Sequence, residues 1–200
     1  RLIFSTKQRP FFDPLIVHLA ADYEQTIGQL ATHWPLIFSA LAQRFWPGPL
    51  TLVTRKTELV SPLITSGLDT VALRCPSHPI TLEILRQLKV PLAAPSANRF
   101  GRTSPTRAEH VLAEFDGQVP VVDGGACSVG LESTVLDAHE ENGLWRLRIL
   151  RPGGVSAQEI QEVLKKMGFH FSLERAESSA SPGHLKAHYQ PQNPVVILGS

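Results

Sequence analysis

Short apolar runs bounded by polar residues, proline or glycine recur along the chain, a pattern typical of strands buried in a sheet. Residues 15–19 form such a run directly after Pro14. Residues 50–54 and 70–74 have the β-branched composition that favours extended backbone. The sequence predicts strands at residues 15–19, 50–54, 70–74, 90–94, 119–122, 133–136 and 144–150.

Between the predicted strands, apolar residues recur at the three- and four-residue spacing of an amphipathic helix. Thr106 with Glu109, and Ser156 with Glu159, have the spacing of a capping box, in which the two side chains satisfy the first N–H groups of a helix. Asp22 is the expected N-cap of an earlier helix. The sequence therefore predicts helices over residues 22–33, after Pro35, over residues 81–88, from Thr106 toward Gly117 and from Ser156 toward Gly168.

The alternation of short strands and helices predicts an α/β domain over residues 1–171, built on a mixed twisted sheet. From residue 172 to residue 193 the pattern gives way to Ser, Ala, Glu, Pro and Gly, which is typical of an extended linker. Residues 194–200 resemble the first strand of a further domain. The chain opens on Arg1 without a targeting signal and closes within that run, so we expect it to be truncated at both ends.

The composition, 42% hydrophobic and 18% charged residues, is that of a soluble globular chain. No apolar run approaches the roughly 18 to 20 residues that span a bilayer, so no membrane segment is expected. Cys75 and Cys127 lie far apart without a CxxC spacing, which argues against a disulfide framework or a zinc site and favours a reducing, cytoplasmic location. The first 110 residues hold 12 Lys and Arg against 7 Asp and Glu. This excess is modest and more typical of a solvated surface than of a nucleic-acid site.

Common catalytic signatures are absent, because the chain contains no GxxxxGK[ST], GxGxxG, HExxH or GxSxG. Polar clusters nevertheless follow several predicted strands. Lys7 and Arg9, two residues apart on a segment expected to be extended, would present both cations to one face and clamp a polyanion. Taken alone, such a pair is more often ordinary surface charge.

The other clusters are also weak individually. Ser96, Asn98 and Ser104 follow a predicted strand, as an α/β ligand crevice requires, although a turn with local backbone bonding explains them equally well. Residues 151–154 offer a guanidinium and backbone N–H groups to an anion, or form a simple strand-to-helix turn. His18, on an apolar strand, would by itself be a core histidine.

Taken in order, these clusters resemble the L-threonylcarbamoyladenylate synthase family, whose fold is called YrdC-like. Seven ordered motifs over about 150 residues carry the resemblance, and the segment around Tyr189 is similar to the linker of the longer, two-domain members. The quoted motifs are Lys7-x-Arg9-Pro10, Pro14-Leu15 with His18, residues 47–51, residues 70–76, Pro95-Ser96-Ala97-Asn98, Gly130 with Ser133-Thr134-Val135, and residues 150–153. The resemblance implies an α/β, YrdC-like twisted mixed sheet with flanking helices around a concave, positively charged cavity.

The family reaction converts L-threonine, bicarbonate and ATP to threonylcarbamoyl-AMP and pyrophosphate, for the N6-threonylcarbamoyladenosine modification of tRNA. The resemblance thus implies a cytoplasmic nucleotidyltransferase that uses Mg²⁺ with ATP and has no protein metal site. Its catalytic cations would be Lys7 and Arg9. The ATP-binding positions it implies are Lys7, Arg9, Asp13, Thr70, Ser96, Asn98, Ser104, Arg151 and Tyr189. The L-threonine-binding positions are His18, Arg74, Ala94 and Ser133.

Two departures from the family pattern are visible. The family's opening strand and its Pro-Thr-Glu-Thr-x-Tyr-Gly-Leu segment are missing before Arg1, and Asp13 stands where many members have Asn. A negative charge near ATP is unfavourable unless it is paired or faces a metal. Implied partners are the downstream threonylcarbamoyl-transferase proteins and a contact with tRNA or double-stranded RNA.

Three other hypotheses remain. In the first, the chain is an RNA-binding module of the same fold without adenylate-forming activity. In the second, it is a domain like those of hydrogenase-maturation carbamoyltransferases, and in the third it is a non-catalytic remnant. The joint presence of Lys7, Arg9, Ser96, Asn98 and Arg151 favours the synthase.

Overall fold

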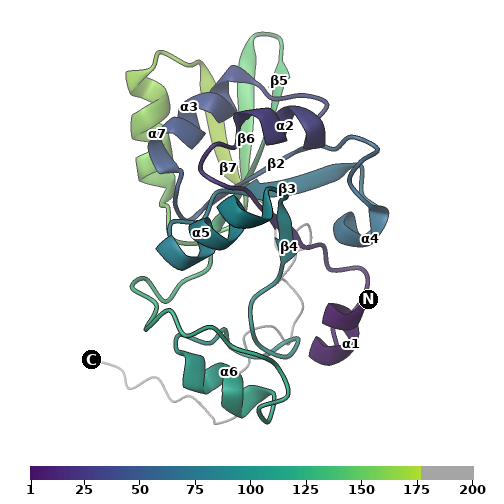
Figure 1. Ribbon diagram of the computed structural model, residues 1–200. Helices are drawn as coiled ribbons and strands as arrows, with labels where there is room; N and C mark the ends of the chain where they lie inside the picture. The colour runs from purple at the N-terminus through teal and green to yellow at the C-terminus, as the bar shows by residue number, and fades with distance from the viewer. Residues whose placement is uncertain (177–200) are drawn as a thin grey trace, which may run out of the picture.

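The computed structural model describes residues 1–176, in which seven strands form one mixed sheet of order β4-β1-β3-β2-β5-β6-β7 (Figure 1). Three neighbouring pairs are parallel, β1 with β3, β2 with β5 and β6 with β7, and the other three are antiparallel. The strands are β1 (Ile16–His18), β2 (Leu50–Arg55), β3 (Thr70–Arg74), β4 (Leu92–Ala94), β5 (Thr134–Glu141), β6 (Leu144–Arg151) and β7 (Phe171–Arg175).

Side chains alternate along these strands and divide the sheet into an apolar face and a face of mixed chemistry. Helices α3 (Leu36–Phe45) and α7 (Ala157–Lys166) contribute Ile37, Leu41, Ile160 and Leu164 to the core on the apolar face. Burying one such side chain contributes roughly 1.5–3 kcal/mol, so the core fixes which face of each strand points inward. The strand residues of this core are Val17, Leu50, Leu52, Val71, Leu73, Leu136, Leu147 and Ile149.

Of the other five helices in residues 1–176, one has ten residues, like α3 and α7, and the remaining four are shorter. The five are α1 (Leu2–Lys7), α2 (Glu24–Leu30), α4 (Pro62–Thr65), α5 (Pro79–Leu88) and α6 (Ala108–Glu114). In Figure 1, α6 and the loops that flank it lie below the sheet, reached through β4. No helix among residues 1–176 combines the length and the hydropathy that a membrane crossing requires.

The predicted helix starts have mixed outcomes. The capping box of Ser156 and Glu159 is confirmed, with both reciprocal hydrogen bonds present. The box predicted for Thr106 is wrong, because α6 begins after Arg107 without a side-chain cap and the Thr106 backbone N–H donates to His110 Nδ1 instead. Asp22 is also not a cap, since Tyr23 occupies that position without a side-chain bond.

Three further expectations are corrected by the backbone. Lys7 and Arg9 do not share an extended segment, because Lys7 ends α1 and Gln8 adopts a left-handed conformation with φ 54°. Residues 119–122 form no strand. The sheet continues through β7, past the expected domain boundary at residue 171, because Phe171–Arg175 pairs in parallel with β6. The rest of the expected linker, from residue 177, and residues 194–200 lie outside the described residues.

Candidate functional site

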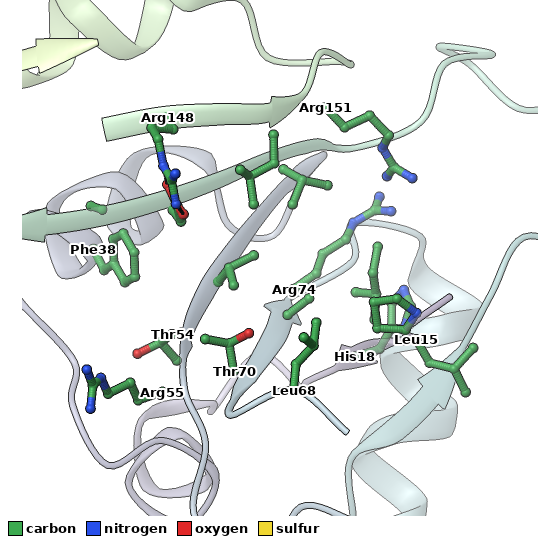
Figure 2. Close-up of a pocket in the computed structure, with 18 of the residues that line it drawn as sticks. Leu15, His18, Phe38, Thr54, Arg55, Leu68, Thr70, Arg74, Arg148 and Arg151 are labelled. Atoms are coloured by element: carbon green, nitrogen blue, oxygen red, sulfur yellow. Dashed lines mark hydrogen bonds and ion pairs between the residues drawn. The ribbon is translucent and has the colours of Figure 1, made fainter. Parts of the chain in front are cut away.

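A cavity of about 810 Å³ lies on the mixed face of the sheet (Figure 2). Its walls come from alternate residues of the central strands, such as Ile16 and His18 on β1 and Ala72 and Arg74 on β3. It brings together residues that are far apart in the sequence. The predicted site residues that line it are Arg9, Asp13, His18, Thr70, Arg74, Ala94, Ser96 and Arg151.

His18 and Arg74 are register partners on the parallel strands β1 and β3. Arg74 is held by its Nε, which donates to the carbonyl of Gly48 at 3.0 Å. Gly48 lies in the turn after α3, where a Cβ would stand 2.2 Å from the Phe45 carbonyl oxygen, so only glycine fits. Burial and the nearby Arg74 lower the pKa of His18 to about 4. The imidazole is therefore neutral at physiological pH and acts as a polar wall rather than as a cation.

Arg151 closes the same end of the cavity, and Figure 2 shows its guanidinium pointing toward that of Arg74. It donates from Nη2 to the carbonyl and the hydroxyl of Ser133, at 3.0 Å each, and from Nε to the same carbonyl at 3.2 Å. Ser133 Oγ lies 2.7 Å from Thr51 Oγ1. Ser133 is thus a buried support for Arg151, and it does not itself line the cavity.

Arg9 is fixed by a buried ion pair. Its Nη2 lies 2.8 Å from Asp13 Oδ2, and its guanidinium also donates to the carbonyls of Asp13 and Pro14. The side chains of Arg9 and Asp13 are only 10% and 5% exposed. Burial lowers the pKa of Arg9, Asp13 raises it, and Arg151 lowers it further. Asp13 is therefore paired, which removes the electrostatic objection to a carboxylate at this position.

Lys7 is buried and lies behind the cavity wall. Its Nζ donates to the carbonyl of Ser96 at 2.6 Å and to that of Asn98, which ties α1 to the loop after β4. Desolvation by burial, with a smaller effect from Arg9, lowers the pKa of Lys7 to about 8. An ammonium has three N–H donors, so one donor is left for a ligand.

Asn98 and Ser104 line a second, smaller cavity of about 290 Å³ together with Glu114 and His110. The Asn98 Nδ2 donates to the carbonyls of Arg99 and Arg102, which fixes the orientation of the amide. Its Oδ1 is buried without a hydrogen-bond partner, so it is able to accept a hydrogen bond from a ligand. The predicted ATP-side residues are therefore divided between two cavities.

Sequence reasoning missed Glu132 as a site residue. It lines the large cavity, accepts a hydrogen bond from Ser104 Oγ through Oε1, and has Oε2 at 3.8 Å from Arg151 Nη2. Its charge also stabilises the protonated forms of Arg74 and Lys7, so it acts on both predicted substrate sides. The only signal for it in the sequence is its place between Gly130 and Ser133, within a motif of the family.

The far end of the cavity holds the predicted Thr70 together with residues that sequence reasoning missed. Thr70 lies there beside Thr54 and Arg55, away from Arg151 (Figure 2). Arg148 on β6 is bound to Asp137 on β5 in the same wall, with Nη2 2.5 Å from Oδ2. Among the described residues the lining holds five arginines and four carboxylates, so the positively charged cavity remains a prediction.

Within residues 1–176 no group of three or more His, Cys, Asp or Glu side chains is arranged to hold a metal ion. The two carboxylates nearest the arginine cluster, Asp13 and Glu132, each face an arginine. These donor sets do not suit a protein-held Mg²⁺, which prefers an octahedral set of oxygens.

A mixed α/β sheet with several arginines converging on one cavity defines a domain suited to an anionic small molecule. The family model for Sua5, YciO and YrdC, described as telomere recombination, matches residues 1–153, and the chain belongs to this family.

Curated relatives agree with this membership. The chain is 43% identical over 199 residues to the threonylcarbamoyl-AMP synthase of Pyrococcus abyssi, covering 98% of this chain and 57% of the relative. The synthase of Bacillus subtilis is 41% identical over 198 residues, covering 98% of this chain and 56% of the relative. The chain therefore spans little more than half the length of these relatives.

Solved structures show the same fold. The crystal structure of P. abyssi Sua5 complexed with L-threonine superposes with a TM-score of 0.81 at 41% identity, over 95% of this chain and 55% of that one. Full-length HypF, in its phosphate- and nucleotide-bound form, matches with a TM-score of 0.62 at 17% identity, over 76% of this chain and 23% of that one. This second likeness concerns the fold alone.

Proposed function

We propose that the protein is a threonylcarbamoyl-AMP synthase, a nucleotidyltransferase that acts on L-threonine, bicarbonate and ATP. The observation that carries the proposal is the convergence of Arg9, Arg74 and Arg151 on one cavity in a chain 43% identical to a synthase of that name. The crystal structure of a relative with L-threonine supports the choice of amino acid.

The proposed chemistry has two steps. The ammonium group of threonine loses one proton to solvent, and the resulting amine adds to the carbon of bicarbonate, from which water leaves to give a carbamate. A carbamate oxygen then attacks the α-phosphorus of ATP, and the bond to the β-phosphate oxygen breaks to release pyrophosphate. Bicarbonate, the carbamate, ATP and the leaving pyrophosphate are all anionic, so fixed cations that lower the charge repulsion between them supply most of the catalysis.

Each cation has a proposed task. Arg9 and Arg151 bind the phosphates, and Lys7 offers its remaining N–H to the same group from behind the loop of Ser96. Arg74 pairs with the carboxylate of threonine, beside the neutral His18. Because these guanidiniums are fixed by backbone carbonyls before the ligand arrives, little reorganisation is needed when charge develops.

The remaining contacts complete the proposal. Asp13, Thr70, Ser96, Asn98 and Ser104 are assigned to the ATP side. Ala94 and Ser133 are assigned to the threonine side. Mg²⁺ would be held by the phosphates rather than by protein carboxylates. Tyr189, which is also assigned to the ATP side, lies outside the described residues.

Beyond the reaction itself, we propose that the product serves tRNA modification in the cytoplasm. The proposed partners are a downstream threonylcarbamoyl transferase and an RNA that contacts this domain.

The test is calorimetric titration of ATP and of L-threonine into the chain, with mass-spectrometric detection of threonylcarbamoyl-AMP. Arg151→Gln should weaken ATP binding at least about tenfold, because one charge-assisted contact is worth roughly 1.5–3 kcal/mol. Arg148→Gln is the matched control, since Arg148 lies on the same strand but is bound to Asp137, and it should leave ATP binding unchanged. Salt-dependent RNA binding without any ATP binding would overturn the proposal in favour of an RNA-binding module.

A further inference from the structure

An α-amino acid is a zwitterion, and the proposed site accounts for only one of its two charges. If Arg74 pairs with the carboxylate of threonine, as the proposed function holds, the ammonium group has three N–H donors that also need acceptors. Leaving a cation unpaired in a partly desolvated cavity is costly. The cavity should therefore supply a carboxylate close to Arg74.

Four carboxylates line the large cavity among the described residues, and three are unsuited to this role. Asp13 is buried in its ion pair with Arg9. Asp137 is bound to Arg148 through both oxygens, at 2.5 and 3.1 Å. Glu140 lies in the exposed outer part of β5, three residues beyond Asp137. Glu132 is the fourth.

Glu132 lies in the position that the role requires, and one of its carboxylate oxygens can accept a further hydrogen bond. It immediately precedes Ser133, and it is the carboxylate whose charge acts on Arg74. Ser104 Oγ donates to its Oε1, while its Oε2 lies 3.8 Å from Arg151 Nη2, beyond hydrogen-bond distance. Two nitrogens of Arg151, Nε and Nη2, already donate to Ser133. A carboxylate accepts about four hydrogen bonds, so Oε2 has room for a further donor from the cavity.

We propose that Glu132 binds the ammonium group of the amino-acid substrate and makes the site selective for α-amino acids over other carboxylates. The proposal rests on the proposed function, because it takes Arg74 as the carboxylate partner. Arg74 then binds the carboxylate of the zwitterion and Glu132 binds its ammonium group. Glu132 also accepts a hydrogen bond from Ser104, which is assigned to the nucleotide side. A purely structural Glu132 would instead serve only to hold Ser104 and to balance Arg151.

The experiment compares L-threonine with 3-hydroxybutyrate, which keeps the carboxylate and the hydroxyl but lacks the amine. Both are titrated into the unaltered chain, Glu132→Gln and Asp137→Asn, and ATP is titrated into each as a check. Glutamine retains an acceptor for Ser104 while removing the charge. Asp137→Asn is the matched control, because it removes a different cavity carboxylate that is already bound to Arg148.

We expect Glu132→Gln to weaken L-threonine binding at least tenfold while 3-hydroxybutyrate binds as well as before or better. Asp137→Asn should change neither affinity. If Glu132→Gln bound L-threonine and 3-hydroxybutyrate more weakly by the same factor, or bound L-threonine with unchanged affinity, the assignment of Glu132 would be overturned and the proposed function would stand. Failure of the unaltered chain to bind either ATP or L-threonine would instead overturn the proposed function, and the assignment with it.

Discussion

The buried pair of Arg9 and Asp13 offers a sharp test of how this site is held together. Replacing Arg9 with Met keeps most of the side-chain volume but leaves Asp13, with a side chain only 5% exposed, without its guanidinium. It also removes the donors to the carbonyls of Asp13 and Pro14. The substitution thus removes the guanidinium from a buried carboxylate, which is the more destabilising way to break an ion pair.

The magnitude follows from burial rather than from distance. Breaking a buried pair on one side costs about 3–5 kcal/mol. For a chain of this size, 1 kcal/mol corresponds to about 2–4 °C, so Tm should fall by roughly 6–20 °C. Arg86 and Glu83 on α5 are closer, at 2.6 Å, but their side chains are 69% and 48% exposed. Arg86→Met should therefore leave the midpoint of unfolding unchanged within error.

Urea and thermal unfolding of four chains measure the effect: the unaltered chain, Arg9→Met, Arg9→Met with Asp13→Leu, and Arg86→Met. Because the double variant removes both charges, it should recover at least about 2 kcal/mol of the loss. If Arg9→Met and the double variant were equally destabilised, the cost would come from packing and not from the loss of the guanidinium beside Asp13. A loss no larger than that of Arg86→Met would refute the reasoning altogether.

Three further predictions follow from the same geometry. Gly153→Ala should lower the free energy of unfolding, measured in urea, by at least about 2 kcal/mol, because the new Cβ would stand 2.3 Å from the Glu132 carbonyl oxygen. Gly28→Ala is the control: a Cβ there meets open space, so it should stabilise α2 by about 0.5–1 kcal/mol. Between about pH 4 and pH 6.5 the free energy of unfolding should rise as pH rises. The reason is that His18 has a pKa of 6.5 in the unfolded chain and of about 4 in the folded chain, so only the unfolded chain binds its proton in this range. His18→Gln should flatten this slope. ATP affinity, measured by titration, should fall as pH rises through about 8, because Lys7 loses its charge there. The Lys7→Met variant should bind ATP weakly, and its affinity should not change with pH in this range.

The fold was predictable where burial and pattern agree. Residues 50–54, 70–74, 134–136 and 144–150 all lie in strands, because their alternation places one face against α3 or α7, whereas Ser133, where the third of these strands was predicted to begin, precedes β5. Residues 119–122 have a similar composition but no neighbour in the sheet, and composition alone does not report whether a partner exists. The reverse holds for β7, whose polar half gives a weak pattern, although pairing with β6 makes it a strand.

The site was predictable by residue type but not by arrangement. The separation of two residues between Lys7 and Arg9 suggested one cationic clamp, yet the end of α1 falls between them and sends Lys7 behind the loop of Ser96 while Arg9 lines the cavity. Where a helix ends depends on the competition between its local hydrogen bonds and contacts with residues far away in the sequence. Here the distant contacts are the hydrogen bonds from Lys7 to the carbonyls of Ser96 and Asn98, which lie 89 and 91 residues away.

Glu132 escaped prediction for the same reason. Nothing near it in the sequence distinguishes it from a surface carboxylate. Its chemistry depends on Ser104 and Arg151, which lie 28 residues before it and 19 residues after it. The turn after β6, which follows Arg151, packs closely against residues 132–134 because Gly153 has no Cβ. In an α/β sheet the residues that do chemistry are gathered at strand ends, so the partners of a side chain follow from strand order rather than from distance along the chain. The order β3-β2-β5-β6 is what brings Arg74, Ser133 and Arg151 around this carboxylate.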